Sequence, residues 1–189
     1  MMRRYIILSA LVTLFISNYA FPQEENLQLI TKSKYFSVYS YPGLEVNSLL
    51  NTLDFNYFLQ PDSLTKSGDK GALKLLADTL DALYLEVSDI LDIHIYSFHG
   101  DIKIVRTQSD VSSIFSKYFN QSFPERSFYL HERNTIYIVF PGLTLGMLGH
   151  EISHSIISHY FVIPPPAKMQ EILCGYVEYG LRKETGTLP

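Results

Sequence analysis

Hydrophobic residues between positions 73 and 90 recur at steps of three and four. Charged residues fall between them, so one side of the segment is apolar and the other is polar. This is the period of an α-helix, and it predicts an amphipathic helix whose apolar stripe faces the core. The apolar positions are Leu73, Leu76, Leu80, Leu83, Val87 and Ile90.

Other segments show the same helical period or the composition of short strands. Helices are predicted at 44–53, 111–119, 145–161 and 168–182, and strands at 35–41, 102–106, 127–130 and 135–140. The polar residues 131–134 between the last two strands predict a hairpin. This order of strands and helices predicts an α+β domain.

Three polar or proline-rich stretches separate these elements. Residues 21–34 are predicted to form a loose lead-in, and residues 61–71 a turn-rich loop. The run Pro164-Pro165-Pro166 predicts an extended connection before the last helix, because each proline restricts the residue before it.

The N-terminus has the pattern of a secretory signal. Arg3 and Arg4 precede an apolar run over 5–16, and Ala20 supplies a small residue for cleavage. We therefore predict a signal peptide at 1–20, a single domain at 21–189, and an exported protein, periplasmic or extracellular. The alternative is an uncleaved membrane anchor, for which this stretch is at the short limit. No later segment is apolar for long enough to keep the chain in a membrane once the signal is removed.

Composition narrows the choice of partners. Hydrophobic residues make up 47% of the 189 positions, which suits one packed domain. The 19 acidic residues outnumber the 15 basic ones, and no dense Lys/Arg cluster is present. Nucleic acid is therefore not expected as a partner. The single cysteine, Cys174, excludes an internal disulfide, so an exported chain must rely on packing, which a bound metal would supplement.

The sequence His150-Glu-Ile-Ser-His154 lies inside the helix predicted at 145–161. Residues four apart project from the same helix face, so both imidazoles can bind one zinc ion. Glu151 is offset by about 100° and can activate a water molecule without binding the metal. The alternative is a core helix whose polar edge happens to carry two histidines.

The third ligand must come from elsewhere, because His159 lies too far along an unbroken helix. In the last predicted helix, Glu171-Ile-Leu-Cys-Gly-Tyr176 resembles the Glu-Gly-apolar-Ala-x-Tyr segment of the gluzincin branch of the zincin metallopeptidases, with Ile172 in place of glycine. The resemblance covers about residues 135–182. It implies Glu171 as the third zinc ligand. Cys174 and Glu178 lie near the same helix face and remain alternatives.

The same resemblance implies a zincin-like fold, with a small mixed or antiparallel sheet, an active-site helix and a C-terminal helix bearing the glutamate. It implies a zinc metallopeptidase that acts on a peptide or protein substrate, with Glu151 as general base. It also implies that the strand at 136–140 is the sheet edge that binds substrate, an ordinary buried strand being the alternative. The alternative function is a non-catalytic zinc-binding or envelope interaction protein on the same scaffold.

Overall fold

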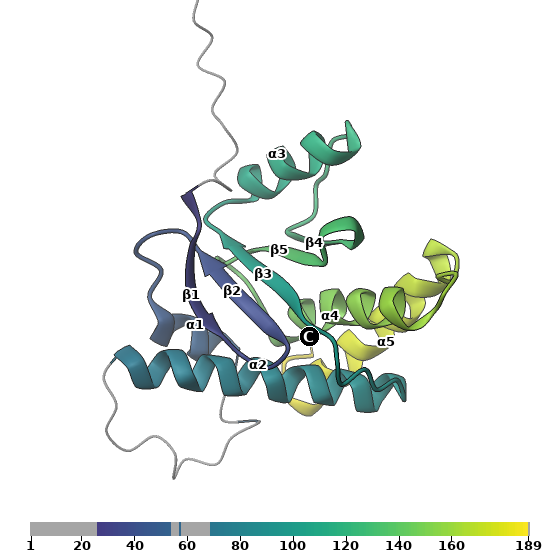
Figure 1. Ribbon diagram of the computed structural model, residues 1–189, viewed down its shortest axis with the longest axis horizontal. Coiled ribbons are helices and arrows are strands. Elements are labelled where there is room, and N and C mark those ends of the chain that lie inside the picture. The colour runs from purple at the N-terminus through teal and green to yellow at the C-terminus, as the bar shows by residue number, and fades with distance from the viewer. Residues whose placement is uncertain (1–25, 54–56, 58–68, 189) are drawn as a thin grey trace, which may run out of the picture.

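A five-stranded mixed sheet forms the centre of the computed structural model, which describes residues 26–53, 57 and 69–188 (Figure 1). The strand order is β1-β2-β3-β5-β4. The three inner strands are parallel, and each edge strand pairs antiparallel with its neighbour. The strands are β1 (Gln28–Lys32), β2 (Phe36–Ser40), β3 (Gly100–Val105), β4 (Ser127–Leu130) and β5 (Thr135–Val139).

The predicted substrate edge at 136–140 is wrong, because β5 lies between β3 and β4. A short 3-10 turn, η4 (His131–Arg133), reverses the chain, and Asn134 adopts the left-handed conformation that completes the reversal. The turn folds β4 onto the outer side of β5. All five residues of β5 are buried, as expected for a strand covered on both sides and both faces. The sheet edge is β4.

The predicted loose lead-in at 21–34 is also wrong for residues 28–32, which form β1. The strand is largely exposed, and its register shifts between Leu29 and Thr31. Its sequence does not alternate between apolar and polar residues, and the backbone pairing with β2 needs no such pattern.

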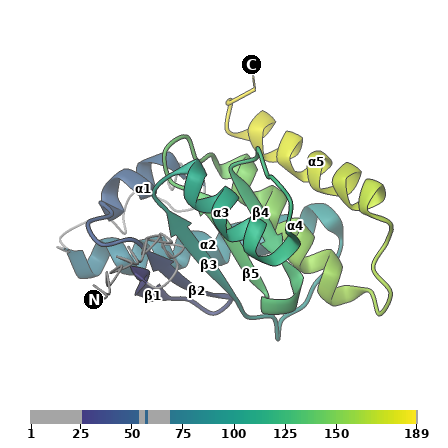
Figure 2. The same cartoon turned by 90° about the horizontal axis from the view of Figure 1, so that it is seen from above.

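Helices cover both faces of the sheet, and all five predicted helices are present (Figure 2). One core joins the sheet to α2 and α4, and a second, smaller core joins its other face to α3. Alternate residues of β5 enter the two cores: Ile136 and Ile138 the first, Tyr137 and Val139 the second. The helices are α1 (Val46–Thr52), α2 (Asp69–Leu91), α3 (Gln108–Phe119), α4 (Leu145–Tyr160) and α5 (Ala167–Glu184).

The helices α4 and α5 pack closely because α4 presents glycine to α5. A Cβ atom on Gly149 would lie 2.2 Å from Cδ1 of Leu181, and one on Gly146 would lie 2.8 Å from Cγ of Arg182. The connection ends at Pro166, whose backbone is extended as the proline run predicts. This approach brings the C-terminal helix across the face of α4 that carries the histidine motif.

The described helices include none with the length and apolar character needed to cross a membrane. The predicted signal peptide and most of the predicted loop at 61–71 lie outside the described residues; of that loop, 69–71 belong to α2.

Candidate metal centre

His150 and His154 lie one turn apart on α4, with ring centroids 5.0 Å apart. Thr144 begins the helix by accepting a hydrogen bond from the Met147 N–H. Ile152 and Ile156 bury the opposite side in the main core. The two imidazoles are therefore held at the border between the core and solvent, where a side chain is shielded yet reachable.

Glu171, from the second turn of α5, meets both imidazoles. Its Oε2 lies 3.4 Å from Nε2 of His150, and its Oε1 lies 3.4 Å from Nε2 of His154. Ligand atoms roughly 2.0–2.1 Å from a tetrahedral zinc ion are about 3.3–3.4 Å apart. Each oxygen of Glu171 therefore lies from one imidazole nitrogen at the separation of two zinc ligands. That the three residues bind the metal stays a prediction.

Cys174 follows Glu171 by one turn of α5 and is completely buried. One nitrogen of each histidine and the cysteine sulfur lie within 4.8 Å of one another. Burial raises the pKa of the Cys174 thiol, and the charges of Glu171 and Glu151 raise it further. Cys174 is thus close enough to remain an alternative ligand, but its burial and raised pKa make the thiolate that zinc binds unfavourable without the metal.

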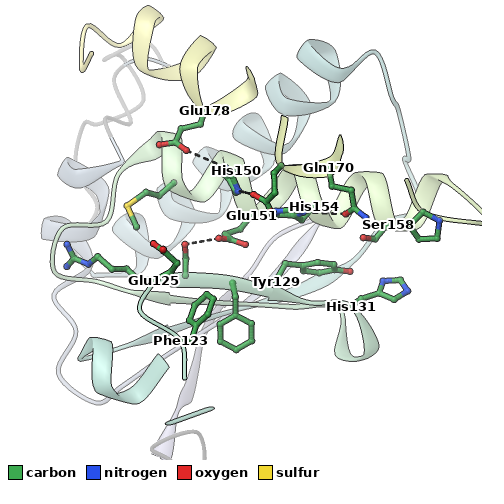
Figure 3. Close-up of a pocket in the computed structure, with 16 residues that line it drawn as sticks. Phe123, Glu125, Tyr129, His131, His150, Glu151, His154, Ser158, Gln170 and Glu178 are labelled. Carbon is green, nitrogen blue, oxygen red and sulfur yellow. Dashed lines mark hydrogen bonds and ion pairs between the residues drawn. The ribbon is translucent and has the colours of Figure 1, made fainter. Parts of the chain in front are cut away.

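Glu178, the remaining alternative, lies behind His150 rather than beside its Nε2. Its Oε2 is 3.3 Å from Nδ1 of His150, an ion-pair distance whose angle does not make a hydrogen bond (Figure 3). Arg182 approaches the other carboxylate oxygen at 3.5 Å. This placement suits a carboxylate that orients a ligand, not one that binds the metal.

Gln170 plays the matching part for His154. Its Oε1 lies 3.4 Å from Nδ1 of His154, while its side-chain amide nitrogen donates to the Pro165 carbonyl at 2.8 Å. The second bond fixes which end of the amide faces the histidine. Both histidines thus have an acceptor beside Nδ1, which favours a proton there and leaves the Nε2 lone pairs free for a metal.

The surroundings shift the pKa values of the two histidines in opposite directions. Burial alone would lower the pKa of His150, but Glu178, Glu151 and Glu171 together hold it above its usual value. Burial and the neighbouring His150 lower the pKa of His154. The close contact with His150 lowers the pKa of the Glu178 carboxyl. A cluster of carboxylates around two imidazoles is an electrostatic environment that attracts a cation.

Glu151 points away from the ligand cluster towards β4. Burial raises the pKa of its carboxyl to about 7, although a hydrogen bond from Ser127 and the charge of His150 act in the opposite direction. Ser127 Oγ donates to Glu151 Oε1 at 2.7 Å. The sequence predicted a strand at Ser127 but no role for its side chain.

A cleft of about 900 Å³ runs between β4 and the helices α4 and α5 (Figure 3). Residues from the edge strand, the loop before it and the turn after it form one wall, including Phe123, Glu125, Ser127, Tyr129 and His131. The motif residues and the start of α5 form the other, including His150, Glu151, His154, Gln170 and Glu171. The predicted zinc ligands and the carboxylate of Glu151 therefore line the same cleft.

Comparisons with protein-family models, with curated proteins and with solved structures gave no significant match for this chain.

Proposed function

We propose that this protein is a zinc metallopeptidase with a zincin-like fold, in which His150, His154 and Glu171 hold zinc and Glu151 is the general base. One observation carries the proposal. Two imidazole nitrogens and a carboxylate from a second helix converge at 3.4 Å beside a buried carboxylate that faces the same cleft. The mixed sheet, the motif helix and the returning C-terminal helix also support it.

Zinc at this position would act as a Lewis acid and bring the pKa of water towards about 7. Glu151 would accept a proton within the cleft and later donate it to the leaving amine. The raised pKa of its carboxyl, about 7, suits a group that must both take and release a proton near neutral pH. Glu178 and Gln170 would keep the histidines in orientation.

The cleft fits a peptide or protein substrate in size. Its volume is within the usual range of roughly 300–1,000 Å³ for ligand sites. Export remains part of the proposal, resting on the basic and apolar N-terminal sequence alone.

A second candidate is an envelope interaction protein on the same scaffold. It is favoured by apolar side chains that are exposed at the end of α4, on the α4–α5 loop and on α5. Val162 is 100% exposed and Ile163 85%. The others are Tyr160, Phe161, Met169, Ile172, Tyr176 and Tyr179. Exposed apolar patches of this kind often mark binding surfaces.

Metal analysis combined with a protease assay on an unfolded substrate distinguishes the metallopeptidase from the interaction protein. We expect about one zinc per chain in the wild type and in Glu151→Gln. Glu151→Gln should lose hydrolysis by about 100-fold or more, because an amide cannot accept the proton.

The double variant His150→Ala/His154→Ala is the control for the site and should bind no zinc. Zinc retained by the double variant would refute the metal centre. A wild type that binds zinc but cleaves nothing in a broad peptide library would favour the interaction protein.

A further inference from the structure

The edge strand β4 contributes a hydroxyl group to the cleft at Ser127. Side chains alternate along the strand, with Phe128 and Leu130 buried in the smaller core against α3. Ser127 and Tyr129 therefore point to the other face, towards α4. Pairing of Ser127 with Ile138 of β5 fixes its position along the strand.

The hydroxyl makes a short hydrogen bond to the buried carboxylate of Glu151. The distance from Ser127 Oγ to Glu151 Oε1 is 2.7 Å, and Glu151 is only 5% exposed. Hydrogen bonds from a hydroxyl to a carboxylate at about this length are charge-assisted and strong. The terminal torsion of a glutamate is otherwise broad, so this bond, together with a backbone hydrogen bond from Tyr129, selects one orientation of the carboxylate plane.

We infer that Ser127 is a positioning residue for the general base. Its hydroxyl keeps its own proton and donates a hydrogen bond to Oε1. Held in this way, the carboxylate stays in the lining of the cleft, where it can accept the reacting proton. The inference rests on the proposed function, because a base can be positioned only for a reaction that occurs.

The two neighbouring hydroxyls on α4 provide a contrast. Ser153 and Ser155 are also buried, but each donates to a backbone carbonyl of its own helix. Ser153 is therefore a matched control, since replacing it removes a buried hydroxyl from the motif helix without touching Glu151.

The experiment compares Ser127→Ala, Ser127→Thr and Ser153→Ala in the zinc-loaded protein. It measures kcat, KM, zinc affinity, the melting temperature and the visible spectrum of the cobalt-substituted form. We expect Ser127→Ala to lower kcat by about 10- to 100-fold, the usual effect of losing such a supporting partner. KM, zinc affinity and the cobalt spectrum should stay unchanged. Ser127→Thr, which retains a hydroxyl, should recover most of the rate, and Ser153→Ala should match the wild type in kcat.

Three results would overturn the inference. Full activity in Ser127→Ala would show that the hydroxyl does not act on the base. A loss of folding or zinc affinity, with normal kcat in the folded, loaded fraction, would show that Ser127 only joins β4 to α4. A zinc-loaded wild type that cleaves nothing would remove the proposed function and this inference together, whereas the first two results leave the proposed function standing.

Discussion

Glu171 and Cys174 lie one turn apart on α5, and both face the histidine pair. Each oxygen of the Glu171 carboxylate lies 3.4 Å from the Nε2 atom of one histidine, which is the separation of neighbouring zinc ligands. The thiol lies deeper, and its raised pKa means that only the metal itself could make it ionise near neutral pH.

We therefore expect Glu171→Ala to weaken zinc binding by more than the roughly 10- to 100-fold cost of losing a supporting group. Cys174→Ala should leave the affinity nearly unchanged. Competition titration with a chelator measures both. The opposite ranking, together with a sulfur signal in zinc X-ray absorption, would show that the cysteine is the ligand.

A second residue-scale prediction concerns Glu86 on α2, far from the histidines in sequence. Burial raises the pKa of its carboxyl, and the charges of Glu184 and Asp89 raise it further. The folded state thus holds this proton more tightly than the unfolded chain does. Ionised Glu86 consequently destabilises the fold above its folded pKa, and this penalty vanishes as the pH falls below the unfolded value of 4.5.

Glu86→Gln should raise the melting temperature at pH 7, and the gain should shrink towards about pH 4. The effect should be about 0.5 kcal/mol or less, because the carboxyl is only partly buried and solvent screens its charge. Thermal unfolding at a series of pH values checks this. Glu132→Gln on η4 controls for the general loss of a negative charge. A gain from Glu86→Gln that is independent of pH would refute the electrostatic explanation.

Sequence reasoning located His150, Glu151 and His154, because their spacing within one helix is local information. Glu171 was accessible only through resemblance, since the helix crossing is not encoded by spacing. Ser127 and Gln170 carried no signal at all. Their roles depend on contacts between segments that only the folded chain brings together.

At the scale of elements, the site depends on how closely α5 approaches α4. Gly149 sits where that approach is tightest, with Leu181 completely buried above it. A methyl group there must displace either the leucine side chain or the whole helix.

Gly149→Ala is expected to destabilise the protein by about 1–3 kcal/mol, the usual cost of overpacking a core. It should also weaken zinc binding, because the displaced α5 carries Glu171. Denaturant unfolding and chelator competition measure the two effects. Gly175→Ala on α5 is the matched control: a Cβ there meets nothing within 4 Å. That change should stabilise by up to about 1 kcal/mol through helix propensity. Equal effects of the two substitutions would show that close packing at Gly149 is not required.

The helices were the easiest elements to predict, because the spacing of hydrophobic residues within one continuous segment indicates a helix. The edges of the sheet were the hardest. The apolar run of β5 is as compatible with an edge as with an interior strand, and only the pairing with both β3 and β4 decides. Residues 28–32 were predicted to be part of a loose lead-in but form the edge strand β1. Backbone pairing needs no apolar pattern, so the sequence did not reveal this strand.

At the scale of the whole molecule, contacts around the proposed metal site join residues close in the sequence, whereas contacts around the sheet join residues far apart in it. The contact between His154 and its supporting residue Gln170 spans 16 positions, whereas the side-chain bond between Ser37 of β2 and His99, just before β3, spans 62. The parallel pairing of β2 with β3 closes an equally long loop. The order of elements in the sequence predicts the α+β class. It does not predict which contacts are short-range and which are long-range.

The parallel pairing of β2 with β3 has a consequence for the time course of folding. Contacts that close short loops cost less chain entropy and form earlier than those that close long ones. The α4–α5 hairpin should therefore become able to capture zinc before the sheet is complete and β4 reaches Glu151. When the unfolded chain is refolded with zinc in a stopped-flow instrument, metal uptake should precede the return of hydrolysis. Simultaneous recovery of both signals would instead mean that the sheet must close before the hairpin can hold a metal at all.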